Sequence, residues 1–139
     1  QIDAPPKSNF PPYTNTLVGD RCLIVEDDPI VAQGWQNFLK HTGLELAIAA
    51  DRQQTDALLE SGFRPDYVLC DLRLRSGDNG YSVLLSILAV CPDASGAMVS
   101  GEFNAKELLE AAEEGIAVLQ KPVSPELLMQ IFMSWRAHS

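Results

Sequence analysis

Four acidic residues of this sequence stand directly after two short apolar runs. Glu26, Asp27 and Asp28 follow the first run, and Asp71 follows the second. Two like charges ~4 Å apart repel each other by ~4 kcal/mol at an effective dielectric constant of about 20. Carboxylates that lie this close together therefore need a shared proton or a bound cation to reduce their repulsion. Mg²⁺ is a suitable cation, because it prefers carboxylate, carbonyl and water oxygens, so the acids predict a magnesium site.

A hydroxyl group and an ammonium group complete this set. Ser100 and Lys121 each follow a further apolar run. An aspartate carboxylate can attack phosphorus and form an acyl phosphate, and phosphoryl transfer depends mainly on neutralising charge on the phosphoryl oxygens. Asp71 can be the nucleophile, while Mg²⁺, Lys121 and the Ser100 hydroxyl each bind one oxygen. The alternative, a merely solvated acidic edge, is disfavoured by the presence of Lys121 and Ser100.

Alternating strands and helices must bring these residues together. We predict strands at residues 22–25, 44–49, 67–70, 97–100 and 116–119, and helices at residues 29–41, 52–61, 80–90, 104–114 and from 125 onward. Strands that are each followed by a helix predict an α/β fold, with a doubly wound, five-stranded parallel sheet and helices on both faces. Ligands of such sheets bind beyond the carboxyl ends of the strands, where the polar residues stand.

The first 19 residues differ from the rest of the chain. Pro5, Pro6, Pro11 and Pro12 lie among polar residues without apolar periodicity. This composition favours a linker or extended arm at residues 1–19, followed by one domain at residues 20–139. The alternative is an N-terminal segment that packs on the domain. Because the chain begins with Gln1, we expect it to be a piece of a longer protein.

Charge and composition exclude several classes of partner. The net charge of −9 disfavours direct binding of nucleic acid, whose phosphates need Lys and Arg. No apolar run reaches the ~20 residues of a membrane-spanning helix, so we expect no membrane contact. The three scattered cysteines are typical of reduced core residues in a cytoplasmic protein. We expect a monomer.

Four segments together resemble the receiver domain of two-component response regulators, over roughly residues 20–138. They are LIVEDDP at 23–29, RPDYVLCD at 64–71, MVSG at 98–101 and LQKP at 119–122. Any one of them alone is weak, but their order and spacing make the resemblance specific. It implies a flavodoxin-like strand order 2-1-3-4-5 and a module that accepts a phosphoryl group from a phosphohistidine.

The resemblance also implies a role for each site residue. Asp71 is the phosphoacceptor, and Ser100 and Lys121 assist the transfer. The implied Mg²⁺ ligands are Glu26, Asp27, Asp71 and the backbone carbonyl of Arg73. Asp27 is the direct ligand of the acidic pair, although a shift of the pair by one residue, to Asp27 and Asp28, stays open. A cis peptide bond between Lys121 and Pro122 is implied as well.

Three departures from the receiver pattern stand out. Arg75 occupies a position that is often proline in the family, and the loop before Gly80 is one residue longer than the commonest pattern. Val118 stands where the family has a switch aromatic, three residues before Lys121. Signalling through an aromatic rotamer is therefore not expected, and the domain is expected to act mainly as a phosphoryl carrier.

The resemblance suggests a signalling module with only weak self-dephosphorylation rather than an enzyme. Its expected partner is a histidine kinase or a histidine phosphotransfer domain, within a hybrid histidine kinase. The alternative is a stand-alone response regulator, or the receiver of a regulator whose output domain lies elsewhere. A phosphohydrolase of the haloacid dehalogenase type is disfavoured, because Arg73 stands where that class has a second Asp. A degenerate receiver is disfavoured by the intact acids and Lys121.

Overall fold

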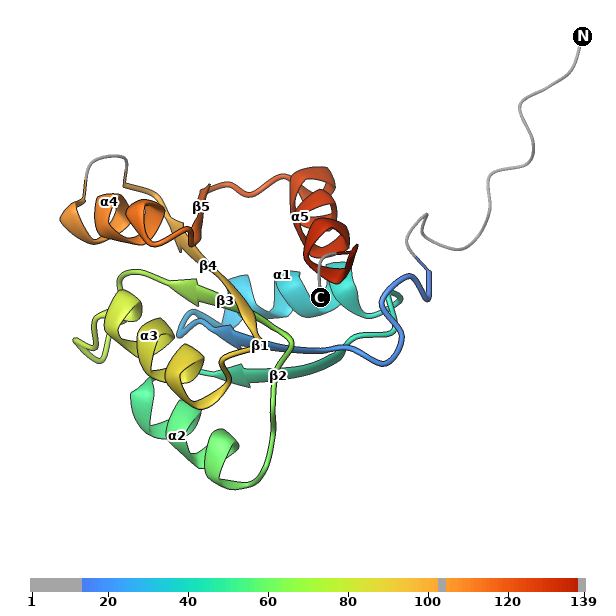
Figure 1. Ribbon diagram of the computed structural model, residues 1–139, viewed down its shortest axis with the longest axis horizontal. Helices are drawn as coiled ribbons and strands as arrows, with labels where there is room; N and C mark the ends of the chain where they lie inside the picture. The colour runs from blue at the N-terminus through green and yellow to red at the C-terminus, as the bar shows by residue number, and fades with distance from the viewer. Residues whose placement is uncertain (1–13, 103–104, 138–139) are drawn as a thin grey trace, which may run out of the picture.

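A parallel β-sheet forms the centre of the computed structural model, which describes residues 14–102 and 105–137. The strands are β1 (Arg21–Val25), β2 (Glu45–Ala49), β3 (Tyr67–Asp71), β4 (Ser95–Ser100) and β5 (Ala117–Gln120). The helices are α1 (Pro29–Leu39), α2 (Arg52–Glu60), α3 (Gly80–Val90), α4 (Lys106–Glu113) and α5 (Pro125–Ala137). The strand order is β2-β1-β3-β4-β5 with every pair parallel (Figure 1), which confirms the predicted fold class.

Two apolar cores lie on the two faces of the sheet. One is covered by α2, α3 and α4, and the other by α1 and α5. Successive residues of a strand point to opposite faces, so Leu23 and Val25 enter the first core while Cys22 and Ile24 enter the second. Burial on both faces explains why the central strands are apolar without interruption. None of the helices among the described residues is long and apolar enough to cross a membrane.

Helix α2 is capped at both ends. The Asp51 side chain caps α2 by accepting a hydrogen bond from the Gln54 backbone N–H at 2.9 Å. The Gln54 side chain accepts in turn from the backbone N–H of Ala50, one residue earlier than the usual capping box reaches. Gly62 follows the helix with φ +99°, a left-handed conformation that favours glycine.

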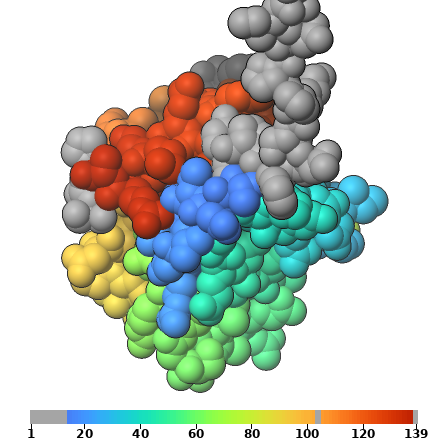
Figure 2. All heavy atoms as spheres, turned by 90° about the vertical axis from the view of Figure 1, so that its right-hand side faces the viewer, coloured from blue at the N-terminus to red at the C-terminus, as the bar shows by residue number. Residues whose placement is uncertain are grey.

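Residues 14–19 pack on the domain, which therefore begins earlier than the predicted residue 20. Leu17 is fully buried in the core between α1 and α5. Its backbone N–H donates to the Thr42 carbonyl, and the N–H of Asn15 donates to the His41 carbonyl. In Figure 2 this blue segment lies between the red α5 and the cyan end of α1. A single buried leucine creates no periodicity, so the sequence did not reveal it. The rest of the predicted arm, residues 1–13, lies outside the described residues.

The buried face of α5 is formed by Leu128, Met129 and Phe132, whereas Leu127 is 44% exposed. On α1, Trp35 is partly buried against the same core.

Candidate functional site

The predicted site residues lie at one edge of the sheet because the strands are parallel and in register. Val25 pairs with Cys70, and Asp71 with Val99. Ser100 pairs with Gln120. The residues that end β1, β3, β4 and β5 therefore emerge beside one another, as the strand pattern predicted.

Three carboxylates form a cluster at this edge. Glu26, Asp27 and Asp71 each offer one oxygen, and these oxygens lie within 4.8 Å of one another. The Lys121 ammonium nitrogen lies 3.4 Å from an Asp71 oxygen and 3.5 Å from a Glu26 oxygen. One cation therefore faces three acids, which leaves the cluster short of positive charge.

Of the three carboxylates, Glu26 is the one whose ionisation is most disfavoured by its surroundings. It is only 5% exposed. Burial raises the pKa of Glu26, and the charge of Asp71 raises it further, while the hydrogen bond from the Asp28 backbone N–H and the nearby Lys121 oppose the increase. A buried carboxyl group that resists ionisation beside two others is the environment in which a bound divalent cation gains most.

Removing the charge of Glu26 is expected to stabilise the domain when divalent cations are chelated. A group whose pKa is raised by folding contributes stability below its ordinary pKa, here 4.5, and this stability is lost as the pH rises through the raised value. Glu26→Gln should therefore have a higher thermal midpoint than wild type at neutral pH in EDTA, and this advantage should shrink toward acid pH. Thermal unfolding across pH measures it, with the exposed Glu60→Gln as control. An advantage independent of pH contradicts the assignment.

Asp28 lies outside the cluster and has a structural role. Its side chain accepts hydrogen bonds from the backbone N–H groups of Ile30 at 2.9 Å and Val31 at 3.5 Å, and so caps α1. Its other oxygen pairs with the Arg75 guanidinium at 3.5 Å. The backbone N–H of Arg75 donates instead to Asp27. Of the two possible acidic pairs, Glu26 with Asp27 therefore agrees better with the geometry.

Ser100 is buried beside the acids, with 3% exposure. Its hydroxyl oxygen accepts from the Glu102 backbone N–H at 3.0 Å. Its carbonyl accepts from the Lys121 backbone N–H at 2.9 Å, which ties β4 to the end of β5. The Ser100 hydroxyl hydrogen remains available for an acceptor at the site. The following peptide bond, between Lys121 and Pro122, is cis, as the resemblance implied.

The Arg73 side chain points to a neighbouring set of acids. Its guanidinium lies 2.7 Å from Glu102 and 3.3 Å from Glu107, the latter on α4. Asn79 also donates to Glu107, at 2.9 Å. The Arg73 hydrogen bond lowers the pKa of Glu102. Glu107 thus joins α4 to the loop after β3, a contact that no short-range sequence pattern reveals.

The long loop after β3 is attached on both sides. Asp78 accepts from the backbone N–H of Arg52 at 3.0 Å, which joins the loop to α2. Gly80 packs directly on the backbone of Asp71, since a Cβ built at Gly80 would lie 1.9 Å from the Asp71 carbonyl oxygen. Gly80 is therefore a site residue that sequence reasoning missed, although its position at the end of the loop is a local signal. Val118, on the edge strand β5, is 37% exposed.

Comparisons with known proteins agree with this architecture. The chain is 31% identical over 110 residues to the alginate biosynthesis transcriptional regulatory protein AlgB of Pseudomonas aeruginosa, covering 78% of this chain and 24% of that protein. It is 32% identical over 112 residues to the Regulator of RpoS of Escherichia coli K12, covering 79% of this chain and 32% of that protein. The chain thus spans about a quarter to a third of the length of these curated relatives.

Solved structures of receiver domains are also similar to this chain. A CheY-like response regulator receiver domain protein from Methanospirillum hungatei JF-1 is 28% identical, with a TM-score of 0.74 over 85% of this chain and 94% of that chain. The signal receiver domain of an HD domain-containing protein from Pseudomonas fluorescens Pf-5 is 25% identical, with a TM-score of 0.78 over 86% of this chain and 95% of that chain. The family described as "Response regulator receiver domain" matches residues 22–133. The chain belongs to this family, the receiver domains of two-component signalling.

Proposed function

We propose that this domain accepts a phosphoryl group on Asp71 from a phosphohistidine. The observation that carries the proposal is the position of Asp71, 3.4 Å from Lys121 and within a cluster of carboxylates at the end of the sheet. An Asp71 oxygen attacks phosphorus and forms the acyl phosphate P–O bond, while the P–N bond of the phosphohistidine breaks. The imidazole leaves with that electron pair and takes up a proton. The donor would be a histidine kinase or a histidine phosphotransfer protein, the partners of this family.

The surrounding residues support this chemistry. Lys121 contacts both Asp71 and Glu26, so its ammonium group can move to a phosphoryl oxygen without leaving the cluster. The Ser100 hydroxyl can donate to a second oxygen. The oxygen ligands fit Mg²⁺, which Glu26, Asp27, Asp71 and the Arg73 carbonyl would hold. When bound, the ion neutralises charge on the phosphoryl oxygens.

We also propose that the domain is a carrier rather than an enzyme with its own substrate. The described acids next to the cluster make other contacts: Asp28 caps α1, and Glu102 and Glu107 pair with Arg73. We therefore expect loss of the phosphoryl group to be slow. The test is incubation with acetyl phosphate and Mg²⁺, followed by peptide mapping. We expect one phosphoryl adduct, on Asp71, that decays without further catalyst. An adduct on another residue would overturn the proposal.

Mg²⁺ binding is expected to depend on Asp27 much more than on Asp28. Asp27 belongs to the carboxylate cluster, whereas Asp28 caps α1. Asn caps helices about as well as Asp, so Asp28→Asn should leave both the fold and Mg²⁺ affinity nearly unchanged. Asp27→Asn should weaken binding by about tenfold or more, in line with the loss of ~1.4 kcal/mol or more of interaction. Calorimetric titration measures both variants, and the reverse order would show that the acidic pair is shifted by one residue.

Two settings for the larger protein follow from this role. A hybrid histidine kinase suits a carrier that passes the phosphoryl group on. A response regulator with an output domain is favoured by the two curated relatives, which are named as regulators and are much longer than this chain. The sequence of the full-length gene distinguishes the two settings directly.

A further inference from the structure

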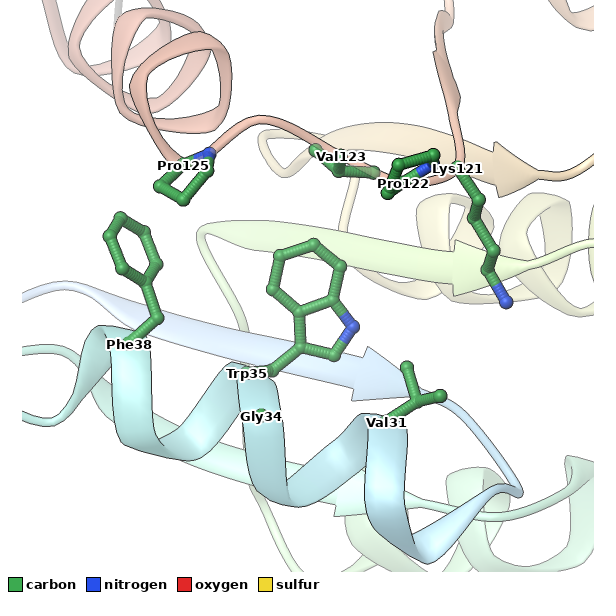
Figure 3. Close-up of a pocket in the computed structure, with 8 residues that line it drawn as sticks. All are labelled: Val31, Gly34, Trp35, Phe38, Lys121, Pro122, Val123 and Pro125. Atoms are coloured by element: carbon green, nitrogen blue, oxygen red, sulfur yellow. The ribbon is translucent and has the colours of Figure 1, made fainter.

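An apolar groove runs along α1 beside the phosphoacceptor site. Figure 3 shows Trp35 and Phe38 of α1 pointing toward the loop between β5 and α5, with Lys121 at one end. The groove has a volume of about 550 Å³. Its lining residues are Val31, Gly34, Trp35, Phe38, Lys121, Pro122, Val123 and Pro125. Aromatic side chains of α1 form one wall and prolines of the loop from β5 to α5 form the other, a surface suited to an extended, proline-rich peptide.

The described part of the chain begins at the far end of α1 from Lys121. The Asn15 backbone N–H donates to the carbonyl of His41, two residues beyond the last residue of α1. Arg136 of α5 donates to the carbonyls of Thr16 at 2.6 Å and Val18 at 3.4 Å. These hydrogen bonds fix the chain between the C-terminal ends of α1 and α5, so whatever precedes residue 14 starts beside the groove.

We propose that the groove is the docking site of the chain's own segment 7–13, with the sequence KSNFPPY. Pro11 and Pro12 favour the polyproline II conformation, which aromatic-lined grooves bind at low entropic cost because it is already extended. Phe10 and Tyr13 flank the proline pair and supply apolar surface for Trp35 and Phe38. The tether adds affinity, because docking within one chain occurs at a high effective concentration.

Length and charge both agree with this occupant. Seven residues in polyproline II span ~22 Å, whereas the eleven residues of α1 span ~16 Å. The segment can therefore run along the whole of α1 from the entry point near His41. Lys7, the only charged residue of the segment, would then reach the beginning of α1, where Asp27 and Asp28 lie.

A spin label on the segment tests the docking in the full chain. Cys22, Cys70 and Cys91 are all buried, so a Ser8→Cys variant can be labelled selectively. We expect the label to broaden the NMR signals of the Trp35 indole N–H and of Val31 and Val123. The same label in a Phe10→Ser/Pro11→Ser/Pro12→Ser background should lose this broadening, while a Pro5→Ser/Pro6→Ser background, outside the segment, should keep it.

Three results would overturn the proposal. Broadening confined to the ends of α1 and α5 would show that the segment stays near its entry point. Equal broadening with and without Phe10, Pro11 and Pro12 would show that no specific contact exists. Broadening seen only between labelled and unlabelled molecules in a mixed sample would assign the groove to a second copy of the chain. Acetyl phosphate labelling of Asp71 is followed in the same samples, because it tests the proposed function independently of the docking.

Discussion

Replacing Asp71 by asparagine is expected to abolish phosphorylation by acetyl phosphate and by a histidine kinase. The amide keeps the size of the side chain but removes the nucleophilic carboxylate. Glu26 also lies beside Lys121, but it is buried, so we do not expect it to replace Asp71 as the nucleophile. Because the acyl phosphate cannot form at all, the loss should be complete rather than partial. Phosphate-affinity electrophoresis or intact-mass measurement records it.

The same variant should remain folded. Asp71→Asn removes one of three clustered carboxylates, so its thermal midpoint in EDTA should equal or exceed that of wild type, because like-charge repulsion is relieved. Asp93→Asn, at an exposed position, is the matched control and should be phosphorylated normally. Persistence of the adduct in Asp71→Asn would move the phosphoacceptor to another residue.

Among glycine-to-alanine substitutions in this protein, Gly80→Ala is expected to have the largest effect. The new Cβ would lie 1.9 Å from the Asp71 carbonyl oxygen and 2.9 Å from the Leu72 Cα. Both are backbone atoms, so no side-chain rotation can relieve the overlap and β3 must move relative to α3. Overpacking of this kind costs about 1–3 kcal/mol or more. Chemical denaturation measures the loss of stability.

The displacement should also weaken phosphorylation, since β3 carries Asp71 at its end. Gly34→Ala provides a matched control in α1, where no heavy atom lies within 4 Å of the added Cβ. That substitution should stabilise the domain by roughly 0.5–1 kcal/mol, because alanine is the better helix former. If the two variants were equally stable, the close packing of Gly80 on Asp71 would be refuted.

The fold and the main site residues were readable from the sequence because the relevant signals are local. An apolar run followed by an acid marks a buried strand and its end within a few residues. Parallel pairing then brings the strand ends to one edge whatever the details of packing. Glu26, Asp27, Asp71, Ser100 and Lys121 could therefore be assembled into one site from the sequence alone.

Only the tertiary structure decided how neighbouring residues divide their roles. Asp27 and Asp28 are equivalent in sequence, but the start of α1 uses Asp28 as its cap and leaves Asp27 with the cluster. Arg73 forms hydrogen bonds with Glu102 and Glu107, which lie about 30 residues further along the chain. Leu17 is buried although its segment is polar. Each of these outcomes depends on contacts between segments that are distant in the sequence. The free energy of such contacts comes from side-chain packing and charge in the folded protein. A short-range sequence pattern does not contain this information.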